Sequence, residues 1–197
     1  MDNLFNTENL AKISKEIFDI ESFFDLRSLN IDTFDIPSDY QLQDFIIANQ
    51  KNYPKLIRAV AEDISHKAED IGCPPQVFTA IYESILNAYQ HGNRKDPNKN
   101  IKIGRKLTKN SLEVCIVDEG GVIQSEFVPF IMAHYAGNYK NGFLDYYQFT
   151  NNKKNDNNQG KGTFFIFSYV DEVRYFKSPS GGLGIYLKKE FQSDSFK

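Results

Sequence analysis

The stretch Tyr82-Glu83-Ser84-Ile85-Leu86-Asn87-Ala88-Tyr89-Gln90-His91-Gly92-Asn93 combines a row of polar side chains with an apolar stripe. Glu83, Asn87 and His91 recur at every fourth residue, so on an α-helix they project from roughly one face. The opposite side of the helix would be buried through an apolar stripe, Phe78, Ile81, Ile85 and Tyr89. A packed helix that presents a carboxylate, an amide and an imidazole can build a site, although such a polar line taken alone is more often a solvated face.

The composition is that of a folded domain. Of the 197 residues, 41% are hydrophobic and 25% are charged, and the length suits one domain with additions. The formal net charge of −3 argues against a general nucleic-acid binder. Cys73 and Cys115 lie far apart, in no metal-like spacing, and are expected to stay reduced. No stretch resembles a signal peptide or a membrane span, so we expect a cytoplasmic protein that contacts neither membrane nor nucleic acid directly.

The beginning of the chain predicts an amphipathic helix. Over residues 1–25, apolar side chains recur at intervals of three or four, at Leu10, Ile13, Ile17, Ile20 and Phe24. Two interpretations stay open. The helix packs on its own domain, or its narrow stripe forms a dimer or partner surface in the manner of a coiled-coil seam.

The middle of the chain alternates between strand and helix patterns. Residues 31–36 predict a strand that ends at Pro37, and residues 45–47 predict a short helix. Pro54 fits the first turn of a further helix, which residues 72–75 would end before the helix quoted above begins. Alternating apolar residues then predict two hairpins, one from residues 101–105 and 112–117, the other from residues 173–176 and 185–188.

Two glycine-containing motifs follow the quoted helix. Asp118 stands at the end of a predicted strand and precedes Glu119-Gly120-Gly121; glycine there lets a backbone approach a ligand closely. Gly160-Lys161-Gly162 precedes an apolar helical run, and a helix N-terminus offers N–H groups to phosphates. Taken alone, each motif is also compatible with a plain turn. Between them, residues 137–162 predict a long loop of the kind found in lids or disordered segments.

Three motifs therefore stand in one order, Glu-x-x-x-Asn on a helix, Asp-x-Gly after a strand, and Gly-x-Gly before a helix. That order resembles the Bergerat-fold (GHKL) ATPases, and most closely the anti-sigma-factor serine/threonine kinases. The matching pieces are Ile36-Pro37-Ser38-Asp39, Asn87-Ala88-Tyr89-Gln90-His91-Gly92-Asn93 with Asp96-Pro97, Val117-Asp118-Glu119-Gly120, Gly160-Lys161-Gly162, and Val170-Asp171-Glu172-Val173-Arg174-Tyr175.

The resemblance implies an α+β fold, a two-layer sandwich in which helices cover one face of a mixed, mostly antiparallel sheet. It covers residues 31–190, which would form the ATP-binding kinase domain. Residues 1–30 would be an N-terminal helical extension and residues 191–197 a C-terminal tail. The same resemblance makes a homodimer plausible.

The resemblance also implies roles for individual residues around ATP and Mg²⁺. Asn87 would ligate the Mg²⁺ that bridges the phosphates, since this ion prefers oxygen ligands and shares them with phosphate. Glu83 would act as general base toward an incoming serine hydroxyl. Asp118 would accept a hydrogen bond from the adenine amino group, with Gly120 leaving room beside the base.

The lid motif would contribute to the phosphate end of the same site. Gly160 and Gly162 would let the lid backbone and the next helix N-terminus wrap the phosphates. Lys161 would add positive charge there, although a lysine between glycines is more often simply solvated. His91 is typical of the family motif, and we assign it a structural role at the end of its helix.

The chain also departs from the family pattern. The family usually continues Asp-x-Gly-x-Gly, whereas Val122 follows Gly121 here, and residues 123–127 replace an expected acidic, proline-rich stretch. Residues 41–51 are interpreted as an insertion, and Gly184 stands where a more regular strand residue is expected.

The expected function is that of a kinase that binds a sigma factor or similar regulator and phosphorylates a small antagonist protein on serine or threonine. The alternative is a non-catalytic module that sequesters a partner and has a degenerate nucleotide site. A kinase acting on histidine is a third possibility. It ranks lower because His66, His91 and His134 do not lie in a recognisable phosphoacceptor helix.

Overall fold

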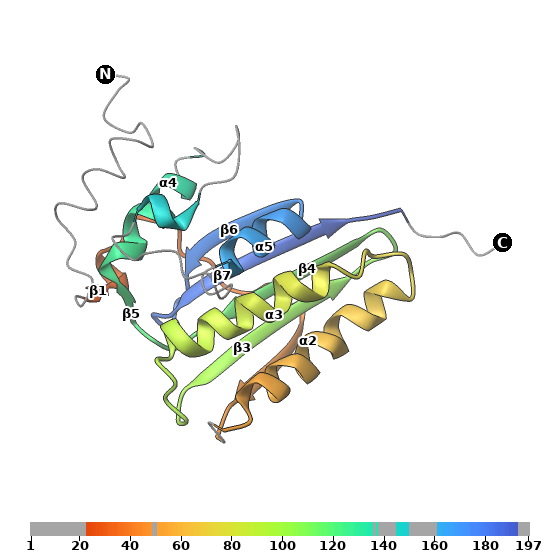
Figure 1. Cartoon of the computed structure of the whole chain (residues 1–197), viewed down its shortest axis with the longest axis horizontal. Helices are drawn as coiled ribbons and strands as arrows, with labels where there is room; N and C mark the ends of the chain where they lie inside the picture. Colours follow the sequence, from red (N-terminus) through yellow and green to blue (C-terminus); the bar gives the residue numbers. More distant parts are fainter. Residues whose placement is uncertain (1–22, 49–50, 136, 138–144, 150–160, 193–197) are drawn as a thin grey trace.

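A five-stranded sheet forms the centre of the molecule in the computed structural model, which describes residues 23–48, 51–135, 137, 145–149 and 161–192 (Figure 1). Its spatial order is β2-β3-β4-β7-β6, and every neighbouring pair is antiparallel. The strands are β2 (Gln41–Ile46), β3 (Asn100–Leu107), β4 (Ser111–Val117), β6 (Glu172–Lys177) and β7 (Leu183–Glu190).

Three helices cover one face of this sheet: α2 (Tyr53–Glu69), α3 (Val77–Asn87) and α5 (Gly162–Tyr169) (Figure 1). The layers meet in one core, to which the helices contribute Ile57, Ile64, Ile81 and Ile85 and the sheet contributes Ile101, Ile103, Val114 and Ile116. The helices, with an apolar period of 3.6 residues, and the strands, with a period of 2, therefore bury their apolar faces against each other. The predicted two-layer α+β sandwich is confirmed; among the described strands the sheet pairs only antiparallel, and one isolated parallel bridge joins Thr33 to Lys177.

A smaller unit lies beside the end of the sheet where Asp118 follows β4. β1 (Phe23–Asp25) pairs with β5 (Val122–Gln124), and the short helices η1 (Leu26–Ser28), η3 (Ser125–Phe127), α4 (Val128–Tyr135) and η5 (Tyr146–Gln148) complete the unit. A second apolar core holds it together, formed mainly by Leu26, Leu29, Ile123, Phe130, Ile131 and Phe149. This unit supplies one wall of the cavity described below.

Several predicted elements are confirmed. α2 begins at Tyr53 with Pro54 in its first turn, and both predicted hairpins form, as β3–β4 and as β6–β7. Asp118 directly follows β4. The long loop predicted over residues 137–162 lies largely outside the described residues, as does the helix predicted at the N-terminus up to residue 22.

Three local predictions are wrong. Residues 31–36 form no strand beyond the bridge at Thr33; they cross the face of the sheet opposite the helices, where Phe34 meets Phe176 at 5.1 Å between ring centroids. Residues 45–47 form no helix, because β2 occupies Gln41–Ile46 and pairs with β3; that residues 41–51 are an insertion relative to the family stays a prediction. Phe24 lies in β1 instead of a helix. In each case partners distant in sequence decide the conformation of a short apolar segment.

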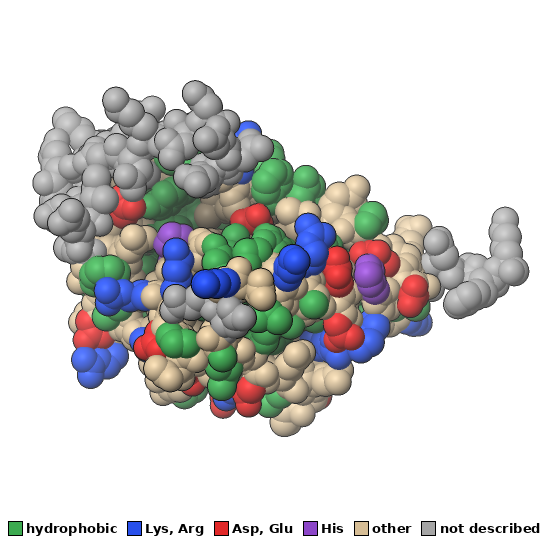
Figure 2. Space-filling model, turned by 60° about the horizontal axis from the view of Figure 1, so that its bottom comes forward, with side chains coloured by type: hydrophobic (Ala, Val, Ile, Leu, Met, Phe, Trp, Pro, Cys, Tyr) green, Lys and Arg blue, Asp and Glu red, His purple; other side chains and the backbone are tan. Residues whose placement is uncertain are grey.

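The outer surface of the helical layer is charged in both signs. The face in Figure 2 shows basic and acidic side chains intermingled with hydrophobic ones. On α2, neighbouring charges pair along the helix, with Lys67 Nζ 3.1 Å from Asp63 Oδ1 and Arg58 Nη1 3.5 Å from Glu62 Oε1. Within the described part of the chain, no helix is long and apolar enough to cross a membrane.

Candidate nucleotide site

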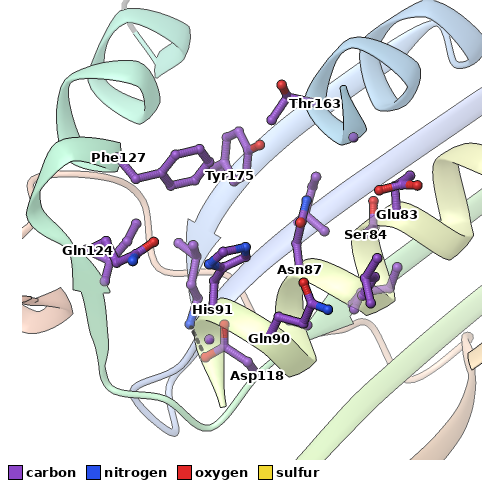
Figure 3. Close-up of a pocket in the computed structure, with 18 of the residues that line it drawn as sticks. Glu83, Ser84, Asn87, Gln90, His91, Asp118, Gln124, Phe127, Thr163 and Tyr175 are labelled. Carbon is purple, nitrogen blue, oxygen red and sulfur yellow. Dashed lines mark hydrogen bonds between the residues drawn. The ribbon is translucent and has the colours of Figure 1, made fainter. Parts of the chain in front are cut away.

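A cavity of about 830 Å³ opens between α3, the start of α5 and the small unit around β5 (Figure 3). This volume lies in the range of small-molecule sites. Four of the residues predicted from the sequence line it, namely Glu83, Asn87, Asp118 and Gly162. Gly120 and Lys161 lie outside the lining, and Gly160 falls outside the described residues. The fold therefore brings at least one residue of each of the three predicted motifs to the same cavity.

The helix that carries the polar row is anchored from behind. Ile81 and Ile85 of α3 are fully buried, and the Ser84 hydroxyl donates to the Ala80 carbonyl oxygen at 2.8 Å. After Asn87 the helix widens into a π-helical turn, Ala88–Gly92. Such turns are frequent at functional sites, because they re-aim side chains. Glu83, Asn87 and His91 follow one another along the side of the helix that borders the cavity (Figure 3).

Glu83 lies against the first residue of α5. A Cβ atom added at Gly162 would lie 2.5 Å from Glu83 Oε2, so only glycine fits there without moving the carboxylate. Burial raises the pKa of Glu83 above its ordinary value. A half-buried carboxylate whose pKa is raised is a stronger base than an exposed glutamate, which suits it to accept a proton from a reacting group in the cavity.

Asp118 is the most deeply buried acid of the cavity, with 3% of its surface exposed. Its Oδ1 atom accepts hydrogen bonds from the backbone N–H groups of Gly120 at 2.8 Å and Leu183 at 3.2 Å. Burial outweighs these bonds and raises the pKa of Asp118 to about 6. No described residue donates to Oδ2, so the carboxylate presents one oxygen to an N–H group of a ligand.

Gly120 is constrained by a neighbouring backbone. A Cβ atom at this position would lie 2.2 Å from the carbonyl oxygen of Gly92, at the end of the π-helical turn. Glycine is thus required for the loop after β4 to pack on that turn. Its predicted role beside a nucleotide base is a separate matter that stays a prediction. Lys161 is exposed and caps α5, where its carbonyl oxygen accepts the Phe165 N–H at 3.1 Å.

Asn93 is a positioning residue that the sequence prediction missed. It is 1% exposed; its side chain donates to the Asn100 carbonyl oxygen at 2.9 Å and accepts the Glu119 N–H at 2.8 Å. One amide therefore ties the end of the polar helix to β3 and to the loop that carries Asp118. Its place directly after His91-Gly92 was the available signal, but the two partners lie 7 and 26 residues away.

Other residues of the cavity wall were also missed. Lys95 lines the cavity and, like Arg94, adopts a positive φ, 60° and 56° respectively, which is uncommon for residues other than glycine. Phe127, Tyr146 and Tyr175 supply an aromatic wall. Their strand and helix patterns predict buried faces but do not tell which neighbours they meet.

His91 lines the cavity, whereas the sequence suggested only a structural role at the helix end. Desolvation at the cavity wall lowers the pKa of its imidazole, against a hydrogen bond with Gln124 that raises it. The net lowering favours the neutral ring at neutral pH. The expected structural role itself stays a prediction.

The residues present fit Mg²⁺ and ATP. Among the described residues no group of three or more His, Cys, Asp or Glu side chains could hold a metal ion. Mg²⁺ needs no such cage, because it usually takes one or two protein oxygens together with phosphate oxygens and water. Asn87 offers an amide oxygen at the cavity, and the unengaged oxygen of Asp118 suits an amino group.

Comparison with known proteins agrees with this geometry. The family model of the histidine kinase-like ATPase domain matches residues 48–192, well over half of the chain. No curated protein gives a match. Domains of this superfamily bind ATP, usually with Mg²⁺, and use it in kinase or ATPase reactions. The chain belongs to the histidine kinase-like ATPase domain family of the GHKL superfamily.

Proposed function

We propose that the chain is an ATP-dependent protein serine/threonine kinase of the partner-switching type. It would bind a sigma factor or a similar regulator and phosphorylate a small antagonist protein. Membership of the family supports ATP binding and ATP-dependent chemistry in general. The protein substrate, the regulator, a homodimeric state and a cytoplasmic location are parts of the proposal.

One observation carries the catalytic part. Glu83 and Asn87 stand one helical turn apart on α3, both line the cavity, and burial raises the pKa of the Glu83 carboxyl. Glu83 would take the proton of a serine or threonine hydroxyl while that oxygen forms its bond to phosphorus. Asn87 would hold Mg²⁺, which supplies charge neutralisation on the phosphates. Asp118 would orient the nucleotide by accepting from its base.

The substitution Glu83→Gln tests this assignment. The glutamine keeps the size of the side chain but cannot accept the proton, so Mg-ATP affinity is expected to stay within about threefold while phosphoryl transfer falls about 10²- to 10⁴-fold. Partners captured from the native host would serve as substrates with radiolabelled ATP. Glu69→Gln on α2, away from the cavity, is the matched control. Transfer by Glu83→Gln at the wild-type rate would show that the base is misassigned.

A second candidate function is a partner-sequestering module without catalysis. Val122 favours it: this residue replaces the second glycine of the usual motif, pairs with Asp25 of β1 and lines the cavity. The family usually has glycine at this position, so the valine side chain narrows the cavity relative to that pattern. Under this alternative the wild-type chain captures its partner, transfers no phosphate to any captured protein, and binds it equally well with and without ATP.

A further inference from the structure

β6 carries one aromatic side chain into the cavity. Along this strand Val173 and Tyr175 face the helical layer, whereas Arg174 stacks over Tyr186 on the opposite face, 4.3 Å from guanidinium carbon to ring centroid. The ring of Tyr175 meets Phe127 edge-on, with centroids 6.0 Å apart and planes at 90°. Further aromatic contacts, to Phe130, His134 and Phe167, surround it. The ring is therefore held in one orientation by packing.

The hydroxyl group of Tyr175 is not used by the part of the chain that the structure describes. No described residue hydrogen-bonds it, whereas Tyr53 accepts from Gln90 Nε2 at 3.0 Å, and Tyr146 donates to Glu126 Oε1 at 2.6 Å. Burial raises the pKa of Tyr175, which keeps its phenol protonated and a hydrogen-bond donor. A fixed donor without a partner at a cavity wall is suited to a ligand acceptor.

The hydroxyl points to the donor-rich end of the cavity. In Figure 3 it is turned toward the space between Asn87 and Thr163, where α5 begins. The first residues of an α-helix present unpaired backbone N–H groups and the positive end of its dipole. The opposite end of the cavity, at Asp118, offers an acceptor instead. A ligand that fits both ends carries an N–H group on one side and anionic oxygens on the other.

We propose that Tyr175 is a phosphate-binding residue, which donates its phenolic hydrogen to a phosphate oxygen of the nucleotide. The inference rests on the proposed nucleotide site and adds one residue that its motifs do not contain. Tyr175 supplies binding and orientation of the phosphate chain, whereas Glu83 and Asn87 would keep the roles given above.

The test compares ligands with and without phosphate in the full chain. Isothermal titration with a non-hydrolysable Mg-ATP analogue, Mg-ADP and adenosine is performed on the wild type and on Tyr175→Phe. Since the substitution removes one hydrogen bond to a charged group, the affinity for at least one of the phosphate-bearing ligands should fall about 10- to 100-fold. Adenosine affinity should change less than about twofold, since the phenyl ring preserves the packing. Tyr169→Phe on α5, outside the cavity lining, is the matched control and leaves all three affinities unchanged.

Each other outcome overturns the proposal in an identifiable way. Equal losses for adenosine and for the phosphate-bearing ligands would mean that the ring shapes the cavity and its hydroxyl contacts no phosphate. Unchanged affinities in Tyr175→Phe would show that the hydroxyl does not contribute to nucleotide binding, while the proposed function stands. A wild-type chain that binds none of the three ligands would refute the nucleotide site itself, and this inference with it.

Discussion

Replacing Asp118 by asparagine should stabilise the ligand-free protein and weaken its nucleotide site at the same time. The carboxyl is 3% exposed, and burial raises its pKa to about 6 from an ordinary 3.8. The folded protein therefore holds a proton on Asp118 between pH 4 and 6 that the unfolded chain releases. Stability from this group falls as the pH rises through that window, because the folded state binds more protons than the unfolded state.

The size of the effect follows from the two pKa values. A rise in the pKa of Asp118 from 3.8 to about 6 lowers the free energy of unfolding by about 3 kcal/mol at a pH where the group is ionised in both the folded and the unfolded protein. Asparagine does not ionise, and its carbonyl oxygen can still accept from the N–H groups of Gly120 and Leu183. Its NH₂ group then faces the cavity, where it cannot accept a hydrogen bond from the amino group of a ligand. ATP affinity is expected to fall at least about tenfold.

Denaturant unfolding at pH 4 and at pH 8 measures the stability effect in both proteins. The free energy of unfolding of Asp118→Asn minus that of the wild type should rise by about 2 to 3 kcal/mol from the lower to the higher pH. Other titrating groups cancel in this difference. Parallel pH profiles of the two proteins would refute the argument, since they would show that Asp118 has the same pKa folded and unfolded.

Two further substitutions separate the shape of the site from the stability of the fold. Gly162→Ala places a methyl group 2.5 Å from Glu83 Oε2, so we expect the carboxylate to move and phosphoryl transfer to drop at least about tenfold. The melting temperature should stay unchanged or rise, because alanine favours helix more than glycine does. Transfer at the wild-type rate would show that this contact is unimportant. Tyr89→Phe removes a hydroxyl that is buried without a partner among the described residues, so the free energy of unfolding is expected to rise by about 1 kcal/mol in denaturant titration; a fall of that size would mean that the hydroxyl is satisfied in solution.

The central helix could be predicted because its signals are local. The apolar stripe of α3 and the spacing of Glu83 and Asn87 depend on residues within a few turns of one another, and the preceding prolines set its start. The two hairpins are predictable for the same reason, since each pairs neighbouring segments across a short turn. These elements contain most of the fold's centre.

The parts that were missed depend on contacts distant in sequence. Asp118 takes its position from Leu183, 65 residues away, and Asn93 joins two segments that no local pattern connects. The apolar residues of β2 are too few to distinguish a strand from a helix in the sequence. The segment is a strand because it pairs with β3, which lies more than 50 residues further along the chain. Tyr175 belongs to a predicted strand, yet period-2 alternation gives the face of a side chain and not its neighbours.

Titration of the full chain with Mg-ATP tests the central claim most directly. We predict one saturable site with a dissociation constant below about 1 mM, and a lower ATP affinity of this site when Mg²⁺ is chelated with EDTA. Asn87→Ala should lose affinity in Mg²⁺ and change little in EDTA, because its amide oxygen is assigned to the metal. Absence of binding at millimolar Mg-ATP, or equal behaviour of Asn87→Ala and the wild type in Mg²⁺, would contradict the account.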